Sequence, residues 1–110
     1  MEMKTSELIG AALDWAVAKC EEKFFAEAGE KFKPAYSPST NWSQGGPIIE
    51  RELILTMCPS TGDFWDARKA GLSSALEKRY FRGPTPLIAA MRCYVASKLG
   101  DNVDIPNNLF

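Results

Sequence analysis

Apolar residues recur at helical spacing near the start of the chain, and this pattern predicts a helix over about Ser6–Phe25. Thr5 or Ser6 is suited to cap its first turn, because a side-chain oxygen there accepts hydrogen bonds from free backbone N–H groups. The apolar stripe of this helix, repeating every three or four residues, consists of Leu8, Ile9, Ala12, Leu13, Trp15, Ala16 and Cys20.

A second helical pattern, with clear start and stop signals, lies at Pro86–Leu99. Thr85 is a good N-cap, and Pro86 suits the first helical position, where its missing N–H costs no hydrogen bond. Gly100 supplies the left-handed residue that ends many helices. The apolar stripe consists of Leu87, Ile88, Met91, Val95 and Leu99. The polar tail that follows, residues 101–110, is expected to be docked or flexible, and its apolar residues able to dock are Ile105, Pro106, Leu109 and Phe110.

Proline and glycine residues interrupt any regular pattern over residues 29–47, which are therefore expected to form a loop. At most a short strand fits near Ala35–Tyr36. The next segment, Pro47–Pro59, is rich in apolar and β-forming residues and is predicted to be a strand. Its charged triplet Glu50–Glu52 is expected on a wet face, or at a bulge or turn.

A second strand is predicted over Asp63–Ala70, with Phe64, Asp66 and Arg68 on one face. Together with the preceding strand it would make an antiparallel hairpin. Residues 71–82 fit two alternatives, a short helix over Leu72–Tyr80 or a charged loop.

These elements predict an α+β fold of two layers, in which the N- and C-terminal helices pack on one face of a small antiparallel sheet. The length of 110 residues fits a single domain. The apolar stripes of the two helices are expected to meet in a shared interior, formed by Leu8, Ile9, Leu13, Met91 and Val95.

Composition narrows the function classes without revealing a reaction. Apolar residues make up 45% and charged residues 25%, values that exclude a disordered chain, a collagen-like fibre and a membrane-spanning protein. The net charge of −1 gives no overall attraction to nucleic acid or anionic lipid. The charge is uneven, however, because residues 1–30 carry seven acidic against three basic side chains, and residues 68–82 carry five basic against one acidic.

Histidine is absent, which excludes Ser-His, Cys-His and His-metal sites within this chain. The three cysteines, Cys20, Cys58 and Cys93, form no C-x-x-C pair, so no zinc or redox motif is indicated and no cofactor is expected. Unpaired cysteines are typical of a reducing compartment. The sequence shows no signal peptide and no membrane span, and we therefore expect a cytoplasmic protein without membrane contact.

The segment Tyr36–Arg51 combines a tryptophan, polar side chains and two glycines, a composition typical of binding loops. Its candidate binding residues are Asn41, Trp42, Gln44, Gly45, Gly46, Glu50 and Arg51. The favoured interpretation is structural: Trp42 would anchor the loop on the core while the glycines form a turn.

Three acidic residues suggest a weaker, enzymatic alternative. On a strand, Glu50 and Glu52 would share a face at a spacing of roughly 7 Å, and with Asp66 they could hold a divalent ion. The competing interpretation is a solvated sheet face, because no nucleophile accompanies them.

A basic and aromatic run near residue 80 suggests nucleic-acid binding, since cations meet phosphates and rings stack on bases. Its residues are Lys78, Arg79, Tyr80 and Arg82. The alternative is a solvated loop with the rings tucked inward. Arg92, in the last helix, would either pair with an acid of the first helix or face water.

Three blocks of the chain resemble the NinX-like family of lambdoid phage and prophage proteins: Met3–Cys20, Ser39–Glu52 and Gly83–Asp101. The resemblance implies a phage or prophage origin and action in the cytoplasm of an enterobacterial host. It implies no activity, and it carries over no catalytic residue.

Together these observations favour a non-enzymatic phage accessory protein that binds a host or phage macromolecule. The alternatives are nucleic-acid binding and a carboxylate- or metal-dependent enzyme. A homodimer through the uncovered sheet face is also expected, because so small a two-layer fold leaves that face open.

Overall fold

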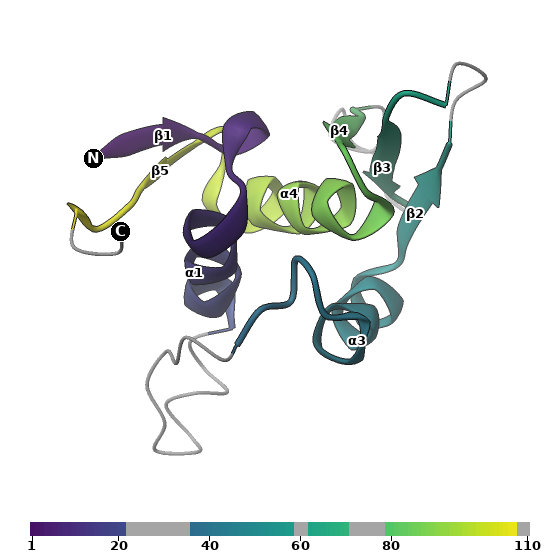
Figure 1. Ribbon diagram of the computed structural model, residues 1–110, viewed down its shortest axis with the longest axis horizontal. Coiled ribbons are helices and arrows are strands. Elements are labelled where there is room, and N and C mark those ends of the chain that lie inside the picture. Colours follow the sequence, from purple (N-terminus) through teal and green to yellow (C-terminus); the bar gives the residue numbers. More distant parts are fainter. Residues whose placement is uncertain (22–35, 59–61, 71–78, 108–110) are drawn as a thin grey trace.

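The computed structural model describes residues 1–21, 36–58, 62–70 and 79–107 (Figure 1). Described elements, in chain order, are β1 (Glu2–Lys4), the 3-10 turn η1 (Thr5–Glu7), α1 (Gly10–Cys20), α3 (Trp42–Glu52), β2 (Ile54–Met57), β3 (Trp65–Lys69), β4 (Phe81–Gly83), α4 (Pro86–Leu99) and β5 (Asn102–Asp104). The strands form a two-stranded and a three-stranded antiparallel sheet. The predicted α+β class is therefore confirmed.

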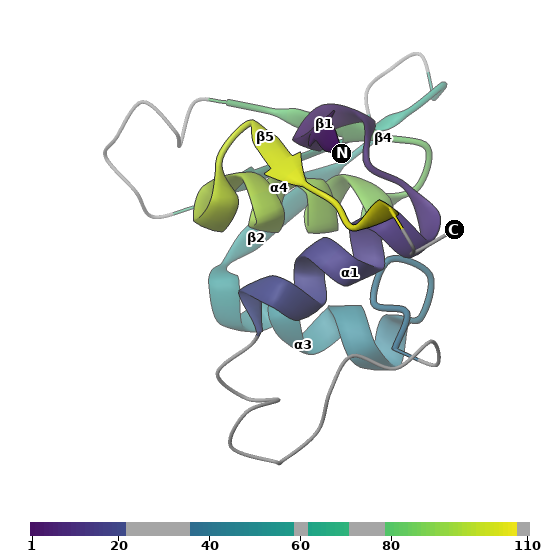
Figure 2. The same cartoon turned by 90° about the vertical axis from the view of Figure 1, so that its left-hand side faces the viewer.

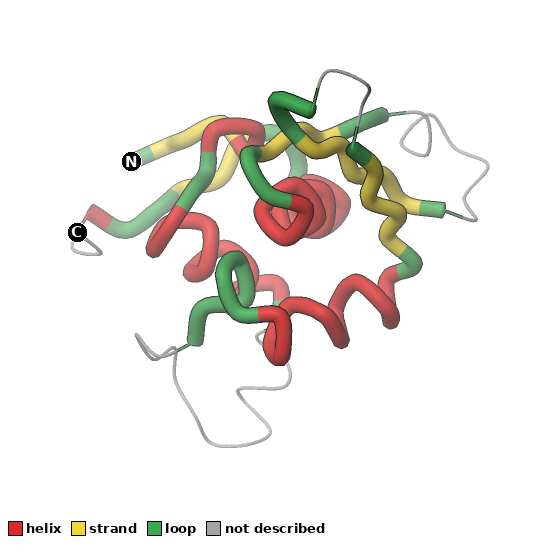
Figure 3. The backbone as a smooth tube through the Cα atoms, turned by 45° about the vertical axis from the view of Figure 1, so that its right-hand side comes forward, coloured by secondary structure: helices red, strands yellow, loops and turns green. Residues whose placement is uncertain are grey.

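Helix α4 lies at the centre of the fold, and Figure 3 shows it surrounded by the other elements. Its buried residues face all directions rather than one stripe: Leu87, Ile88, Ala89, Ala90, Met91, Cys93, Tyr94, Val95 and Ala96. A helix that is apolar all round must be covered on all sides, and α4 packs against α1, α3 and the β2–β3–β4 sheet. Its predicted N-terminus is confirmed, since Thr85 Oγ1 accepts a hydrogen bond from the Ile88 N–H at 3.1 Å.

The three-stranded sheet has the order β2–β3–β4. The predicted hairpin is confirmed as the β2–β3 pair, in which Ile54 lies opposite Lys69 and Met57 opposite Asp66. Helix α4 packs directly on one face of this sheet. Helix α1 lies on the same side of the sheet but packs on α4 (Figure 1). Strand β4 occupies part of the ambiguous segment 71–82, whose residues 71–78 lie outside the described residues.

A second, two-stranded sheet joins the two ends of the chain, which the sequence patterns did not predict (Figure 2). Strand β1 pairs with β5, and the amino group of Met1 contacts Asp104 Oδ1 at 3.1 Å. Ile105 is fully buried, so the chain after α4 packs on the body at this residue. Leu109 and Phe110 lie outside the described residues.

The predicted shared interior is confirmed for Leu8, Leu13, Met91 and Val95, which are all fully buried. Ile9 does not belong to it, because its side chain is 52% exposed. The reason is that α1 begins at Gly10 rather than Ser6, so Ile9 is an extended residue before the helix. Leu8 enters the core from the segment between η1 and α1.

The prediction of a loop up to residue 47, followed by a strand from Pro47, is wrong over residues 42–52, which form α3. Gly45, Gly46 and Pro47 are poor helix formers. Tertiary packing outweighs their propensities, because Gly45 and Ile48 are buried on the side of α3 that faces α4. The strand expected near Ala35–Tyr36 is not formed at Tyr36, and Ala35 lies outside the described residues.

Candidate functional site

Residues 42–51 of the predicted binding segment form most of helix α3 and not an open loop. Asn41 caps the helix, and its Oδ1 accepts hydrogen bonds from the Ser43 N–H at 2.9 Å and the Ser43 hydroxyl at 2.6 Å. Trp42 follows as the first helical residue, and its side chain is 55% exposed. The interpretation that Trp42 anchors a loop on the core is therefore wrong.

Gln44 and Gly45 face inward and fix α3 to the preceding turn. Gln44 Oε1 accepts a hydrogen bond from the Ser37 N–H at 2.6 Å. A Cβ atom on Gly45 would overlap the Pro38 carbonyl oxygen and would lie 2.6 Å from Leu87 Cδ1. Only glycine allows this approach of helix to turn, so both residues serve the fold.

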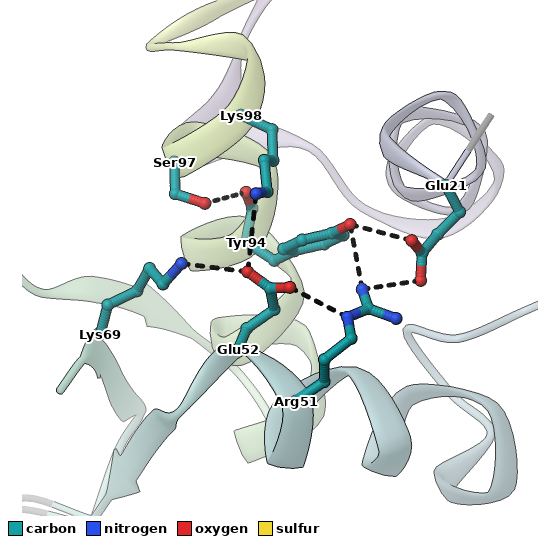
Figure 4. Close-up of polar contacts among 7 residues, drawn as sticks. All are labelled: Glu21, Arg51, Glu52, Lys69, Tyr94, Ser97 and Lys98. Carbon is teal, nitrogen blue, oxygen red and sulfur yellow. Dashed lines mark hydrogen bonds and ion pairs between the residues drawn. The ribbon is translucent and has the colours of Figure 1, made fainter. Parts of the chain in front are cut away.

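Arg51 joins a polar cluster that connects α1, α3, α4 and β3 (Figure 4). Its Nη2 donates to Glu21 Oε1 at 2.9 Å and to the Tyr94 hydroxyl at 3.2 Å, and its Nε donates to Glu52 Oε2 at 2.9 Å. The Tyr94 hydroxyl donates to Glu21 Oε2 at 3.0 Å. These bonds make a closed ring among Glu21, Arg51 and Tyr94.

Glu52 extends the cluster towards the sheet. Its Oε1 accepts a hydrogen bond from Lys69 Nζ at 3.0 Å and lies 3.7 Å from Lys98 Nζ. Burial opposes ionisation of Glu52, but the hydrogen bonds from Arg51 and Lys69 outweigh it and lower the pKa of this carboxyl group. The charges of this cluster are thus paired and hydrogen-bonded with one another, and the pairs stabilise the docking of α3 on the rest of the fold.

Glu50 does not share a face with Glu52. Because both lie on a helix instead of a strand, Glu50 is exposed to solvent while Glu52 points towards α4. Asp66 is on β3 and pairs with Arg82 at 3.6 Å. The structure therefore does not bring the three carboxylates together, and the residues that it describes contain no group of three or more potential metal ligands.

Apolar residues lie along one face of α3 and at its C-terminal end. Trp42, Gly46 and Ile49 are spaced four and three residues apart and therefore align along the helix, and Leu53 follows as its C-cap residue. Ile49 packs partly against the core. The side chains at the two ends of the stripe are 55% exposed at Trp42 and 62% exposed at Leu53. We call these four residues the α3 stripe.

Leu53 ends α3 in the left-handed conformation, with φ 55° and ψ 51°. It is the one described residue other than glycine that has a positive φ. A leucine costs roughly 1 kcal/mol more than glycine in this conformation. The chain thus places a large apolar side chain on the surface at a position where glycine would be more stable.

The predicted basic residues gather around β4. Arg79 and Tyr80 precede this strand and Arg82 lies in it, whereas Lys78 lies outside the described residues. Arg79 pairs with Asp101 at 2.8 Å. Phe64 and Arg68, which the sequence pattern did not place in this group, lie beside these residues: Phe64 contacts Arg82 and Arg68 contacts Tyr80.

Arg92 does not pair with an acid of the first helix. Its Nε donates to the Leu8 carbonyl at 2.8 Å and its Nη1 to the Arg82 carbonyl at 2.7 Å. Burial lowers the pKa of this guanidinium. Arg92 therefore joins the N-terminal segment and β4 to α4.

Glu21, Tyr94 and Lys69 belong to the polar cluster, although no sequence pattern predicted them. Each is 17 or more residues in the chain from the residue that it contacts, Arg51 or Glu52, so no local spacing relates them to it. Tyr94 lies between the buried residues Cys93 and Val95 and was the available signal, since a buried tyrosine hydroxyl usually finds a partner.

Comparison with known families identifies one match. The family described as "Bacteriophage P22, NinX" matches residues 4–98, which include every described helix except the last residue of α4. No curated protein matches the chain. Among the described residues, no helix is long and apolar enough to cross a membrane.

Proposed function

The chain belongs to the bacteriophage P22 NinX family, and from this premise we propose that it is an accessory protein that binds a protein partner in the host cytoplasm. The observation that carries this proposal is the α3 stripe. Tryptophan is enriched at the energetic centres of protein interfaces, and Trp42 is 55% exposed in this stripe.

The conformation of Leu53 supports the same surface independently. Strained backbone conformations cluster at functional sites of proteins. Here the strained residue is also the most exposed of the large apolar side chains described, at 62%. Trp42 and Leu53 are therefore the two exposed ends of the stripe, on either side of Ile49, which packs partly against the core.

The size of the stripe favours a short apolar segment of another protein over a permanent dimer. Helix α3 has 11 residues, so the stripe is about 16 Å long and about 10 Å wide. A stable interface needs roughly 800 Å² on each partner, which is several times larger. We expect a transient contact, with Glu50 beside the stripe favouring a basic flank on the partner.

The test is recovery of partners from lysate of phage-infected host cells, with the full chain as bait. Trp42→Ala and Leu53→Gly should each lose the same partner, whereas Ile9→Ala should retain it. Ile9 is a matched control because its side chain is 52% exposed on another part of the surface. Recovery of identical proteins by all four baits would contradict the proposal, as would turnover of a small substrate by the pure protein.

The expected homodimer through the open sheet face stays a prediction. Light scattering of the purified chain tests it: the mass of one chain, 12.2 kDa, would refute it. The Trp42 and Leu53 variants should not change that mass, since the α3 stripe is a separate surface.

A further inference from the structure

We propose that the outer face of the β2–β3–β4 sheet binds single-stranded nucleic acid. This inference concerns a different surface from the α3 stripe and does not rest on the function proposed above. Helix α4 packs on the inner face of the sheet (Figures 1 and 3), and no described helix covers the outer one.

The register of the strands determines which side chains share the outer face. Buried Ala67 and Phe81 are paired on the inner face. Their neighbours along the strands point the other way, so Arg68, Asp66 and Arg82 lie outside. Leu55 and Met57 of β2 stand beside Arg68 and Asp66 in the same register and are exposed.

Three arginines of this sheet region each lie over an aromatic ring. Measured from the guanidinium carbon to the ring centre, the distance on the outer face is 3.5 Å for Arg82 and Phe64 and 5.9 Å for Arg68 and Tyr80. The third pair, Arg79 and Phe81 at 4.9 Å, does not belong to this face, because the ring of Phe81 is buried on the inner side. Tyr80 is 53% exposed. Planar guanidinium groups and exposed rings are the surfaces on which unpaired bases stack.

Within the described part of the chain, Arg68 is the arginine of this surface without an ion pair. Its Nε is buried without a hydrogen-bond partner, and no carboxylate of the described residues is within ion-pair distance of this guanidinium. The other two arginines form pairs, Arg82 with Asp66 at 3.6 Å and Arg79 with Asp101 at 2.8 Å. Both arginines are well exposed, so these pairs contribute little to stability and can yield to a phosphate.

A shallow groove continues the surface between β4 and η1. Its lining residues are Ser6, Asp66, Arg79, Tyr80, Phe81 and Arg82. Ser6 lines this groove together with Arg79 and Arg82, and a backbone phosphate accepts hydrogen bonds from hydroxyl and guanidinium groups. The surface therefore offers rings for bases and donors for phosphates within one strip.

The chemistry favours a single strand over the other occupants. Bases in a duplex are stacked on each other and cannot reach Tyr80 or Phe64. A second copy of this chain, related by a two-fold axis, would bring the patch against itself and so set arginine near arginine. Three strands span roughly 10 Å, which suits two or three nucleotides.

Fluorescence anisotropy with labelled single-stranded RNA and DNA of about 12 nucleotides tests the proposal at about 50 mM salt. Neutralising two or three phosphates predicts a slope of log K against log salt of about −1.4 to −2. Arg68→Gln and Tyr80→Leu should each weaken binding by about 5-fold or more. A duplex of the same sequence should bind more weakly than either single strand.

Lys19→Gln is the matched control, because it removes the same charge from the exposed surface of α1. It should leave the affinity unchanged. Circular dichroism of each variant verifies that it is folded. A flat titration with the wild-type chain would overturn the proposal, and so would equal affinities of the Arg68, Tyr80 and Lys19 variants. Preferential binding of the duplex would contradict the stacking argument.

Discussion

Two adjacent glycines of α3 offer a test of the fold, because the structure gives them opposite surroundings. A Cβ atom at Gly45 would overlap the Pro38 carbonyl oxygen and lie 2.6 Å from Leu87 Cδ1. At Gly46 the nearest such atom is Trp42 Cε3, at 4.0 Å. The same substitution, glycine to alanine, therefore meets a crowded site at one position and an open site at the next.

The expected change in the free energy of unfolding is the sum of a helix-propensity term and a packing term. Alanine is better than glycine inside a helix by about 0.8–1.0 kcal/mol, and Gly46→Ala should gain up to this amount. Gly45→Ala has the same propensity term, but overpacking costs about 1–3 kcal/mol. The carbonyl of Pro38 is backbone and cannot rotate away. Because the propensity terms cancel, the two variants should differ by about 1–3 kcal/mol, with Gly46→Ala the more stable.

Urea unfolding of both variants, followed by circular dichroism, measures this difference directly. In thermal unfolding, 1 kcal/mol corresponds to a Tm shift of about 3–6 °C for a domain of this size. If the two glycines formed a turn, as the sequence pattern predicts, the helix term would vanish and Gly46→Ala would not stabilise the chain. Equal stabilities, or a more stable Gly45 variant, would refute the placement of α3.

Three further outcomes are expected. Leu53→Gly should raise the free energy of unfolding by up to about 1 kcal/mol in urea titrations, because glycine relieves the left-handed backbone. The pKa of Glu52 is lower in the folded chain than its unfolded value of about 4.5, so ionised Glu52 stabilises the fold above that pH, and this contribution is lost as pH falls through the folded pKa. In Glu52→Gln the free energy of unfolding should therefore fall less steeply as pH is lowered. Among the cysteines, exposed Cys58 should react first with a thiol reagent, whereas burial raises the pKa of Cys20 to about 12 and of Cys93 to about 11, so both should react only on unfolding.

The sequence was sufficient to predict those elements whose capping residues and apolar spacing lie within a few positions of one another. Thr85, Pro86 and Gly100 delimit α4 correctly because capping depends on groups within one helical turn. The β2–β3 hairpin likewise pairs segments that are close in the chain. The α+β class follows from these elements alone.

The candidate binding residues were predicted as a group but perform different tasks. Trp42 and Glu50 are on the surface, Gln44 and Gly45 fasten the helix to a turn, and Arg51 joins a polar cluster. No pattern within the segment separates them, since the difference depends on which side of α3 faces α4.

The sequence by itself determined the α+β class, the bounds of the C-terminal helix, the existence but not the start of the N-terminal helix, the hairpin and the lack of histidine chemistry. Each of these depends on residue type or on neighbours a few positions away. Tertiary structure alone decided that residues 42–52 are helical, that β1 pairs with β5, and that Arg68 and Arg82 lie over Tyr80 and Phe64 beside the sheet. The physical reason is that these features gain their stability from contacts between distant segments, and burial against α4 can outweigh the local preferences of Gly45, Gly46 and Pro47.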